Sequence, residues 1–80
     1  MILSVPRVVV DGRVDANSYV ENGFYYFISA TNVPTNYFAV LVMNFRNSGT
    51  DIAMLGLSVE TGDFYTRIRN GSGFGNWIKR

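Results

Sequence analysis

The fold is decided by residues 62–79, which read Gly62-Asp63-Phe64-Tyr65-Thr66-Arg67-Ile68-Arg69-Asn70-Gly71-Ser72-Gly73-Phe74-Gly75-Asn76-Trp77-Ile78-Lys79. Successive side chains of a strand point to opposite sides of a sheet. In the strand predicted here, one face carries Phe64, Thr66 and Ile68. The opposite face, which we expect to meet solvent or an interface, carries Tyr65, Arg67 and Arg69. A glycine-rich turn then leads to the single tryptophan, Trp77.

Three further strands are predicted upstream, where β-branched and aromatic residues alternate with clusters of glycine and asparagine. They span residues 24–29, 37–45 and 52–59. Pro34 bounds the first, because proline lacks the amide donor that a ladder requires. Gly56 inside the third indicates a bulge or a close backbone approach. Helical patterns are nearly absent, so the sequence predicts an all-β domain built on a small antiparallel sheet or sandwich.

The first part of the chain has a pattern of its own. Residues 1–15 are predicted to form an N-terminal strand or hairpin, or a connector, and residues 16–80 the main β domain. Val8-Val9-Val10 precedes Asp11-Gly12, a dipeptide favoured in two-residue hairpin turns because glycine accepts a positive φ. Arg13-Val14 would then begin the returning strand.

The segment 37–45 is apolar on both of its alternating faces. One face carries Tyr37, Ala39, Leu41, Met43 and Phe45, and the other carries Phe38, Val40 and Val42. An antiparallel sheet commonly leaves one face polar and solvated, so two apolar faces require a second layer or a second subunit. A chain of 80 residues without Cys has no disulfide to stabilise its small core. We therefore expect the domain to self-associate.

Composition disfavours several classes of protein. The chain has 7 basic and 6 acidic residues, whereas a strong nucleic-acid binder concentrates positive charge on one face. Its longest apolar run is far shorter than the roughly 20 residues of a transmembrane helix. Residues 1–10 lack a basic segment before their apolar positions, which disfavours a signal peptide. We expect a soluble protein made in the cytoplasm.

Catalytic patterns are weak throughout the chain. It contains no His, which is the most common general base and a usual zinc ligand. Most carboxylates adjoin turns, and a glycosidase needs two of them in a cleft at a controlled separation. The glycines of residues 71–75 are not followed by the Lys-Ser/Thr pair of a phosphate-binding loop. We predict that the protein is not an enzyme and needs neither cofactor nor metal.

An ordered set of motifs resembles the knob domain at the tips of pyocin and phage tail fibres. The set comprises Gly23-Phe24-Tyr25-Tyr26-Phe27, Asn32-Val33-Pro34, the Tyr65-Thr66-Arg67 strand, the glycine-rich turn and Trp77. The resemblance covers residues 16–80 and departs at Phe74, where many relatives have a second Trp. It implies a homotrimer in the tail of a virion, joined to a longer tail fibre or baseplate protein. It also implies a receptor-binding module that recognises a bacterial cell-surface glycan.

The candidate glycan-binding residues lie in and after the last long strand: Tyr65, Arg67, Arg69, Asn70 and Trp77. An aromatic ring can carry the apolar face of a pyranose, and a guanidinium group offers fixed donors for hydroxyl or acidic groups. A structural interpretation stays open beside it. In that interpretation the arginines stack on Tyr65 or pair with Asp63 or Glu60, and Trp77 closes the end of the sheet.

Two other functions are compatible with the sequence. In the receptor-binding function, specificity would reside in loops such as 31–36 and 46–50. The domain could instead register three chains and terminate a fibre without binding a receptor. It could also bind single-stranded nucleic acid, because aromatic residues interleaved with arginine in strands form stacking platforms. The platform would then consist of Tyr25, Phe27, Tyr65, Arg67 and Arg69. The near balance of basic and acidic residues in the chain disfavours nucleic acid as a partner.

Overall fold

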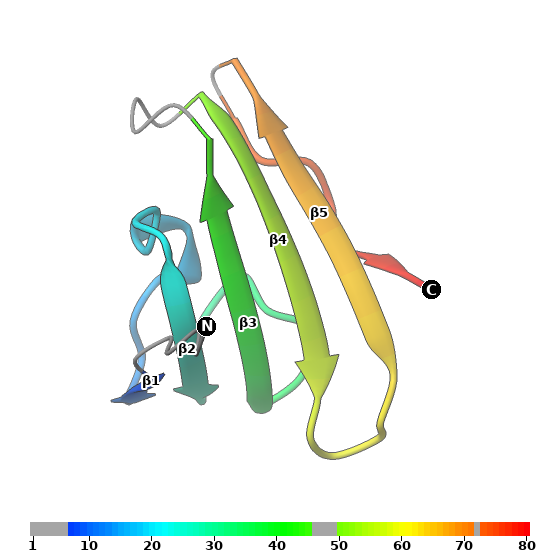
Figure 1. Cartoon of the computed structure of the whole chain (residues 1–80). Coiled ribbons are helices and arrows are strands. Elements are labelled where there is room, and N and C mark those ends of the chain that lie inside the picture. The colour runs from blue at the N-terminus through cyan, green and yellow to red at the C-terminus, as the bar shows by residue number, and fades with distance from the viewer. Residues whose placement is uncertain (1–6, 46–49, 72) are drawn as a thin grey trace, which may run out of the picture.

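The computed structural model describes residues 7–45, 50–71 and 73–80. Its elements in chain order are β1 (Arg7–Asp11), the 3-10 helix η1 (Ala16–Ser18), β2 (Gly23–Ile28), β3 (Tyr37–Asn44), β4 (Asp51–Ser58), β5 (Phe64–Asn70) and β6 (Ile78–Lys79). All six strands form one sheet in which spatial order follows chain order (Figure 1). The predicted all-β class is confirmed. Within these ranges, no helix is long and apolar enough to cross a membrane.

Strands β2 to β5 form an antiparallel meander that the sequence predicted closely. Each pairs with its neighbour in the chain, and one continuous row across the sheet runs Tyr25, Val40, Gly56 and Tyr65. The short β6 then pairs with β5 through Thr66 and Ile78. Residues 59–63 connect β4 to β5, and Gly62 adopts a φ of 79° there.

The predicted N-terminal hairpin is wrong. Strand β1 pairs in parallel with β2, in a register that joins Val10 to Phe27. After Gly12 the chain crosses back through η1, which provides the connection that parallel pairing requires. Ala16 in η1 is 1% exposed, and the Val14 carbonyl accepts a hydrogen bond from the Thr31 amide at 2.8 Å. Burial of this segment against the sheet therefore overrides the local preference of the Asp-Gly dipeptide.

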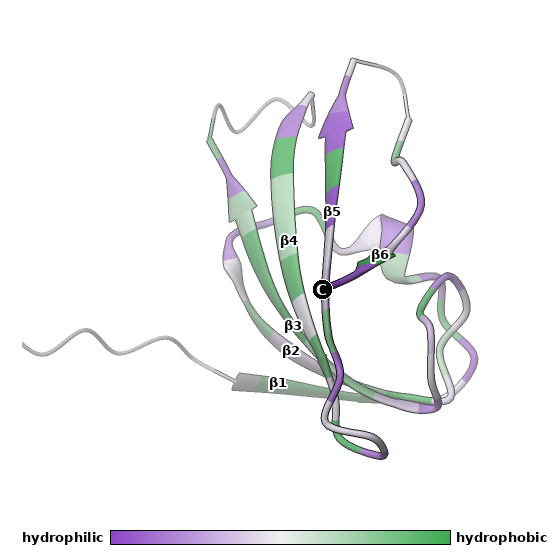
Figure 2. Cartoon of the chain, turned by 90° about the vertical axis from the view of Figure 1, so that its right-hand side faces the viewer, coloured by the Kyte–Doolittle hydropathy of each residue, from purple (hydrophilic) through white to green (hydrophobic). Residues whose placement is uncertain are grey.

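The core lies on one face of the sheet, which we call the covered face. Its buried apolar residues from the strands are Val10, Tyr25, Phe27, Phe38, Val40, Val42, Ile52 and Met54. Segments outside the long strands pack over them and contribute Tyr19, Val33, Phe74 and Trp77. In the turned view of Figure 2, β6 and the chain that leads to it lie to the right of the sheet, on this face.

The other face of the sheet, which we call the open face, faces the viewer in Figure 1. Its residues are mostly apolar, and its polar positions include Asp51, Thr66 and Asn70. By strand alternation it carries Phe24, Tyr26, Ile28, Ala39, Leu41, Met43, Ala53, Leu55, Leu57, Phe64 and Ile68. Its outer positions are accessible: Leu57 is 46% and Ile68 is 61% exposed. No element among the described ranges packs over this face. The two apolar faces predicted for residues 37–45 thus have different surroundings within one chain.

Gly56 marks a close approach between β4 and the side chains above it, one of the two readings that the sequence predicted. A Cβ atom at this position would lie 2.2 Å from Cζ of Phe38 and 3.0 Å from Cζ3 of Trp77. These two rings meet edge to face with centroids 5.0 Å apart. Because Gly56 has no side chain, both rings can pack directly against the backbone of β4.

We predict that Gly56→Ala destabilises the protein by about 1–3 kcal/mol, because the added methyl group overpacks the contact with Phe38. Gly73→Ala is the matched control. Gly73 has no atom within 4 Å of an added Cβ, so this change should alter stability by less than about 0.5 kcal/mol. The measurement is urea unfolding of both variants at one protein concentration. Equal midpoints for the two variants would contradict the proposed role of Gly56.

Candidate functional site

The predicted alternation in β5 is confirmed, but the expected environment of one face is wrong. Tyr65, Arg67 and Arg69 do share a face, yet it is the covered face rather than a solvent-facing one, and Arg67 is 4% exposed. The chain after β5 turns back, and Phe74 bridges to Arg69. This return places Phe74 and Trp77 over the arginines. Asn70 is exposed and lies with the alternate set, away from the other candidates.

Arg67 is surrounded by aromatic rings and a thioether. Its Cζ atom lies 4.2 Å from the centroid of Phe74 and 4.5 Å from that of Trp77, and its Nε donates to Sδ of Met54 at 3.3 Å. Among the described residues, its Nη2 has no hydrogen-bond partner. Desolvation lowers the pKa of Arg67 to about 10, against a smaller opposing effect of the Asp15 charge. The guanidinium group is therefore still charged at neutral pH.

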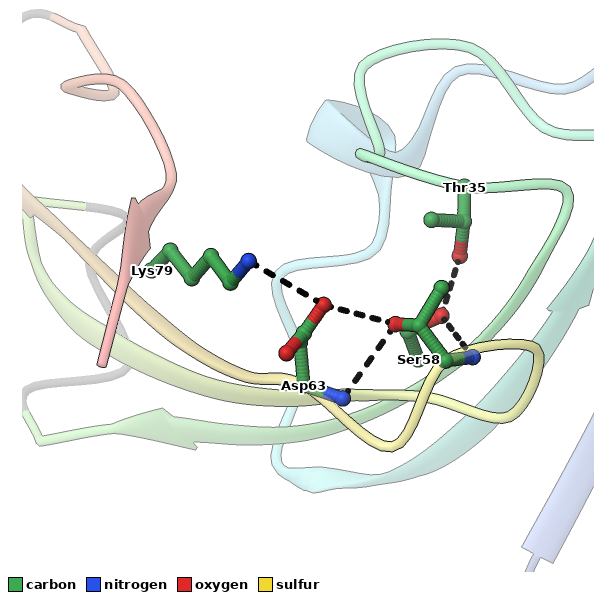
Figure 3. A network of polar contacts seen from close by, with 5 residues as sticks. Thr35, Ser58, Asp63 and Lys79 are labelled. Carbon is green, nitrogen blue, oxygen red and sulfur yellow. Dashed lines mark hydrogen bonds and ion pairs between the residues drawn. The ribbon is translucent and has the colours of Figure 1, made fainter.

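The acidic residues expected to pair with the arginines have other partners. Asp63 lies 3.4 Å from Nζ of Lys79, and Glu60 accepts from the Tyr37 amide at 3.0 Å. Figure 3 shows Asp63 in a network that also includes Thr35, Ser58 and Lys79. Hydrogen bonds to the Thr61 hydroxyl and to Lys79 lower the pKa of Asp63. This network joins the loop after β2, the turn after β4 and strand β6, and it thereby holds the C-terminal segment against the sheet.

Trp77 connects the C-terminal segment to the loop between β2 and β3. Its ring packs on Phe38, and its Nε1 donates to the Asn32 carbonyl at 2.8 Å. Trp77 thus packs against the core, as the structural interpretation allowed, but it lies over the covered face beside Gly56 rather than at the end of the sheet. The ring also contacts the guanidinium group of Arg67, so the tryptophan both closes the core and forms part of the wall of a cavity.

Asn32 organises the neighbouring backbone. It adopts a φ of 62°, and its Nδ2 donates to Oδ1 of Asp15 at 2.7 Å. The same oxygen accepts from the Asn17 amide at 2.8 Å and thereby caps η1. These two hydrogen bonds, first that from Asn32, lower the pKa of Asp15. The start of η1, the loop after β2 and Trp77 are therefore linked in one chain of contacts.

These segments line an open pocket of about 420 Å³, which we call the Trp77 pocket. The residues of its lining that carry the argument are Asn17, Asn32, Tyr65, Arg67, Phe74 and Trp77. The Oδ1 atom of Asn17 is buried and has no partner among the described residues. Aromatic faces, amides and a guanidinium group can bind hydroxyl groups and anions. Within the described ranges, no group of three or more His, Cys, Asp or Glu residues could hold a metal ion.

The structure brings together three of the five predicted site residues, Tyr65, Arg67 and Trp77. Arg69 lies nearby, with its Cζ 5.5 Å from the centroid of Phe74, and Asn70 is remote. Sequence reasoning missed Asn17, and it reached Asn32 only as part of loop 31–36. Residues 46–49 of the second predicted loop lie outside the described residues. The stacking platform for nucleic acid is not available in this chain, because Tyr25 and Phe27 are buried on the covered face.

The chain is similar in structure to a C-terminal fragment of the R2 pyocin fibre of P. aeruginosa, with a TM-score of 0.79 at 19% sequence identity. The match covers 96% of this chain and 22% of that fragment. No protein-family model matches the chain, and no curated protein matches it. At this identity the similarity establishes the fold. The predicted resemblance to pyocin fibres is therefore confirmed at the level of the fold.

We predict that Asn32→Gly raises the pKa of Asp15 toward its ordinary value of 3.8, because the strongest hydrogen bond to the carboxylate is lost. Glycine retains the positive φ at this position. The measurement is an NMR titration of the carboxyl carbons, with the pKa of Asp63 as the internal control. An unchanged pKa of Asp15 would contradict this assignment.

The lowered pKa of Asp15 also has a consequence for stability. A carboxyl group whose pKa is lower in the folded state stabilises the fold above its ordinary pKa, and this contribution disappears as the pH falls through the folded-state pKa. As the pH falls through the folded-state pKa of Asp15, the free energy of unfolding should therefore decrease less for Asn32→Gly than for the unchanged protein.

Proposed function

We propose that this chain is a knob-like tip module of a phage or prophage tail fibre, which assembles as a homotrimer and binds a bacterial cell-surface glycan. In this proposal it belongs to the tail of a virion, joined to a longer tail fibre or baseplate protein, and acts by binding rather than by catalysis. The observation that carries the proposal is the open apolar face on a fold shared with part of a pyocin fibre.

The open face supports assembly because water is a poor environment for it. Leu41 and Leu55 are directly paired at its centre, and more exposed apolar residues surround them. Fully burying one such side chain contributes about 1.5–3 kcal/mol. Large contiguous apolar patches on a protein surface mark interaction sites, and most homo-oligomers have closed symmetry. The knob resemblance favours three copies around one axis, with the open faces directed inward.

The alternative of a fibre cap that does not bind a receptor has an observation in its favour. Trp77, one of the predicted glycan-binding residues, packs against the core, and the buried Arg67, another of them, lies over its ring. A purely structural module would use them in the same way. The two functions share the trimer and differ in whether the domain contacts the host.

We predict that the 80-residue chain has a native mass three times that of the 9.0 kDa polypeptide, and that Leu55→Glu lowers it to that of the monomer. A glutamate at the centre of the open face would leave an unpaired charge buried in the interface. Val59→Glu is the matched control, because Val59 is 56% exposed in the turn after β4. The measurement is light scattering after size exclusion. A folded monomer for the unchanged chain would rule out the trimer.

We predict saturable binding of the purified trimer to host cells and to polysaccharide extracted from them. Fluorescently labelled protein is titrated onto sensitive cells, with resistant cells lacking the polysaccharide as the control. Binding to sensitive cells alone would support the receptor-binding function. A folded trimer that binds neither the cells nor the polysaccharide would instead favour the structural cap. In that case, exchanging the segment between phages should change the yield of assembled fibres but not the host range.

A further inference from the structure

We propose that the Trp77 pocket binds an acidic sugar, a pyranose unit that carries a carboxylate, with Arg67 as the residue that recognises the acid group. This inference rests on the proposed glycan-binding function and specifies its ligand class and its site. It assigns the specificity to a cavity between the strands and their connecting segments, rather than to an exposed strand surface.

The first reason is that Arg67 carries a buried charge and has no counter-ion in contact within the described part of the chain. Buried charged side chains are normally paired with an opposite charge. Arg67 donates instead to the sulfur of Met54, which is a weak acceptor, and its Nη2 has no partner among the described residues. By contrast, the exposed Lys79 has Asp63 beside it. A carboxylate is the group that a guanidinium fork fits best.

The second reason is the balance of charge around Phe74. The guanidinium groups of Arg67 and Arg69 both lie against its ring, and the acidic group whose field acts on Arg67 is Asp15. Asp15 is itself engaged by Asn17 and Asn32. Among the described residues, Arg67 is the charged side chain that lines the pocket, and a ligand with one negative charge matches it.

The third reason is the chemistry of the remaining walls. Trp77 and Tyr65 provide aromatic surface for the C–H groups of a pyranose. The buried Oδ1 of Asn17 is an unused acceptor for a hydroxyl group, and Asn76 adds an amide to the lining. A cavity of about 420 Å³ lies within the usual range for small-molecule sites, roughly 300–1,000 Å³. Aromatic, amide and cationic groups thus converge on one space.

The single tryptophan makes the inference directly measurable, because all intrinsic tryptophan fluorescence comes from the wall of this pocket. The trimer is titrated with glucuronate, galacturonate and N-acetylneuraminate, and in parallel with glucose and galactose as neutral counterparts. We expect saturable changes in Trp77 emission with at least one acid, and affinity for its neutral counterpart weaker by about tenfold or more, as for loss of a charged hydrogen bond. Inorganic phosphate is the control for a general anion site.

Two isosteric variants locate the effect without disturbing the buried Arg67. Asn76→Asp adds a negative charge to the lining at an exposed residue and should weaken binding of the acid several-fold more than binding of its neutral counterpart. Asn22→Asp introduces the same charge elsewhere and retains the Oδ1 acceptor used by the Asn44 amide. It should bind as the unchanged protein does. Both variants are first checked for trimer mass.

Several results would overturn the inference. These are equal affinity for acidic and neutral sugars, an equal response to phosphate, identical behaviour of Asn76→Asp and Asn22→Asp, or no fluorescence response to any of the three acids. The cell-binding titration separates this failure from that of the proposed function. If the trimer binds sensitive cells while the pocket does not respond, the glycan is bound elsewhere and only the assignment to the Trp77 pocket fails.

Discussion

The structure depends on one constraint: the sheet is small and has two apolar faces, and the connecting segments in the described part of the chain cover only one of them. The segment around η1, the loop after β2 and residues 73–77 all pack on the covered face. The open face keeps Leu57, Phe64 and Ile68 partly exposed. A domain of this size buries a smaller fraction of its unfolded surface than larger domains do, and its stability is correspondingly marginal. Covering the open face by other copies would therefore stabilise the fold and determine how it assembles.

The pocket follows from the way in which the covered face is closed. Gly56 admits the rings of Phe38 and Trp77 to the sheet, and Trp77 in turn bonds to the Asn32 carbonyl. These contacts bring the C-terminal segment and the loop after β2 together above β5. Arg67 is enclosed where they meet. The groups that stabilise this end of the domain are therefore the same groups that form the candidate site, so ligand binding there would be coupled to folding.

Much of the sheet could be predicted from the sequence, because its strands are marked by local patterns. Alternation identified β5, the apolar run identified β3, and Gly56 indicated the close approach. The Asp11-Gly12 dipeptide led to the wrong prediction of a hairpin. A local turn preference contains no information about the burial of Ala16, which favours the crossover. Alternation also shows which residues of β5 share a face but not which face the distant chain covers. For the same reason Asn17, 50 residues before Arg67, was not recognisable as part of the site.

The buried arginine is the feature that packing alone explains least. A leucine or methionine in its place would fill space beside Met54 without any cost of desolvation. Burial lowers the pKa of Arg67 but leaves the group charged at neutral pH, and rings with a thioether offset only part of that cost. A carboxylate on a ligand would pair with the Arg67 guanidinium group, and the free chain would not have to bury an acidic residue of its own. A site that retains an uncompensated charge in this way is preorganised for an anion, since the protein bears the desolvation of the cation before the ligand arrives.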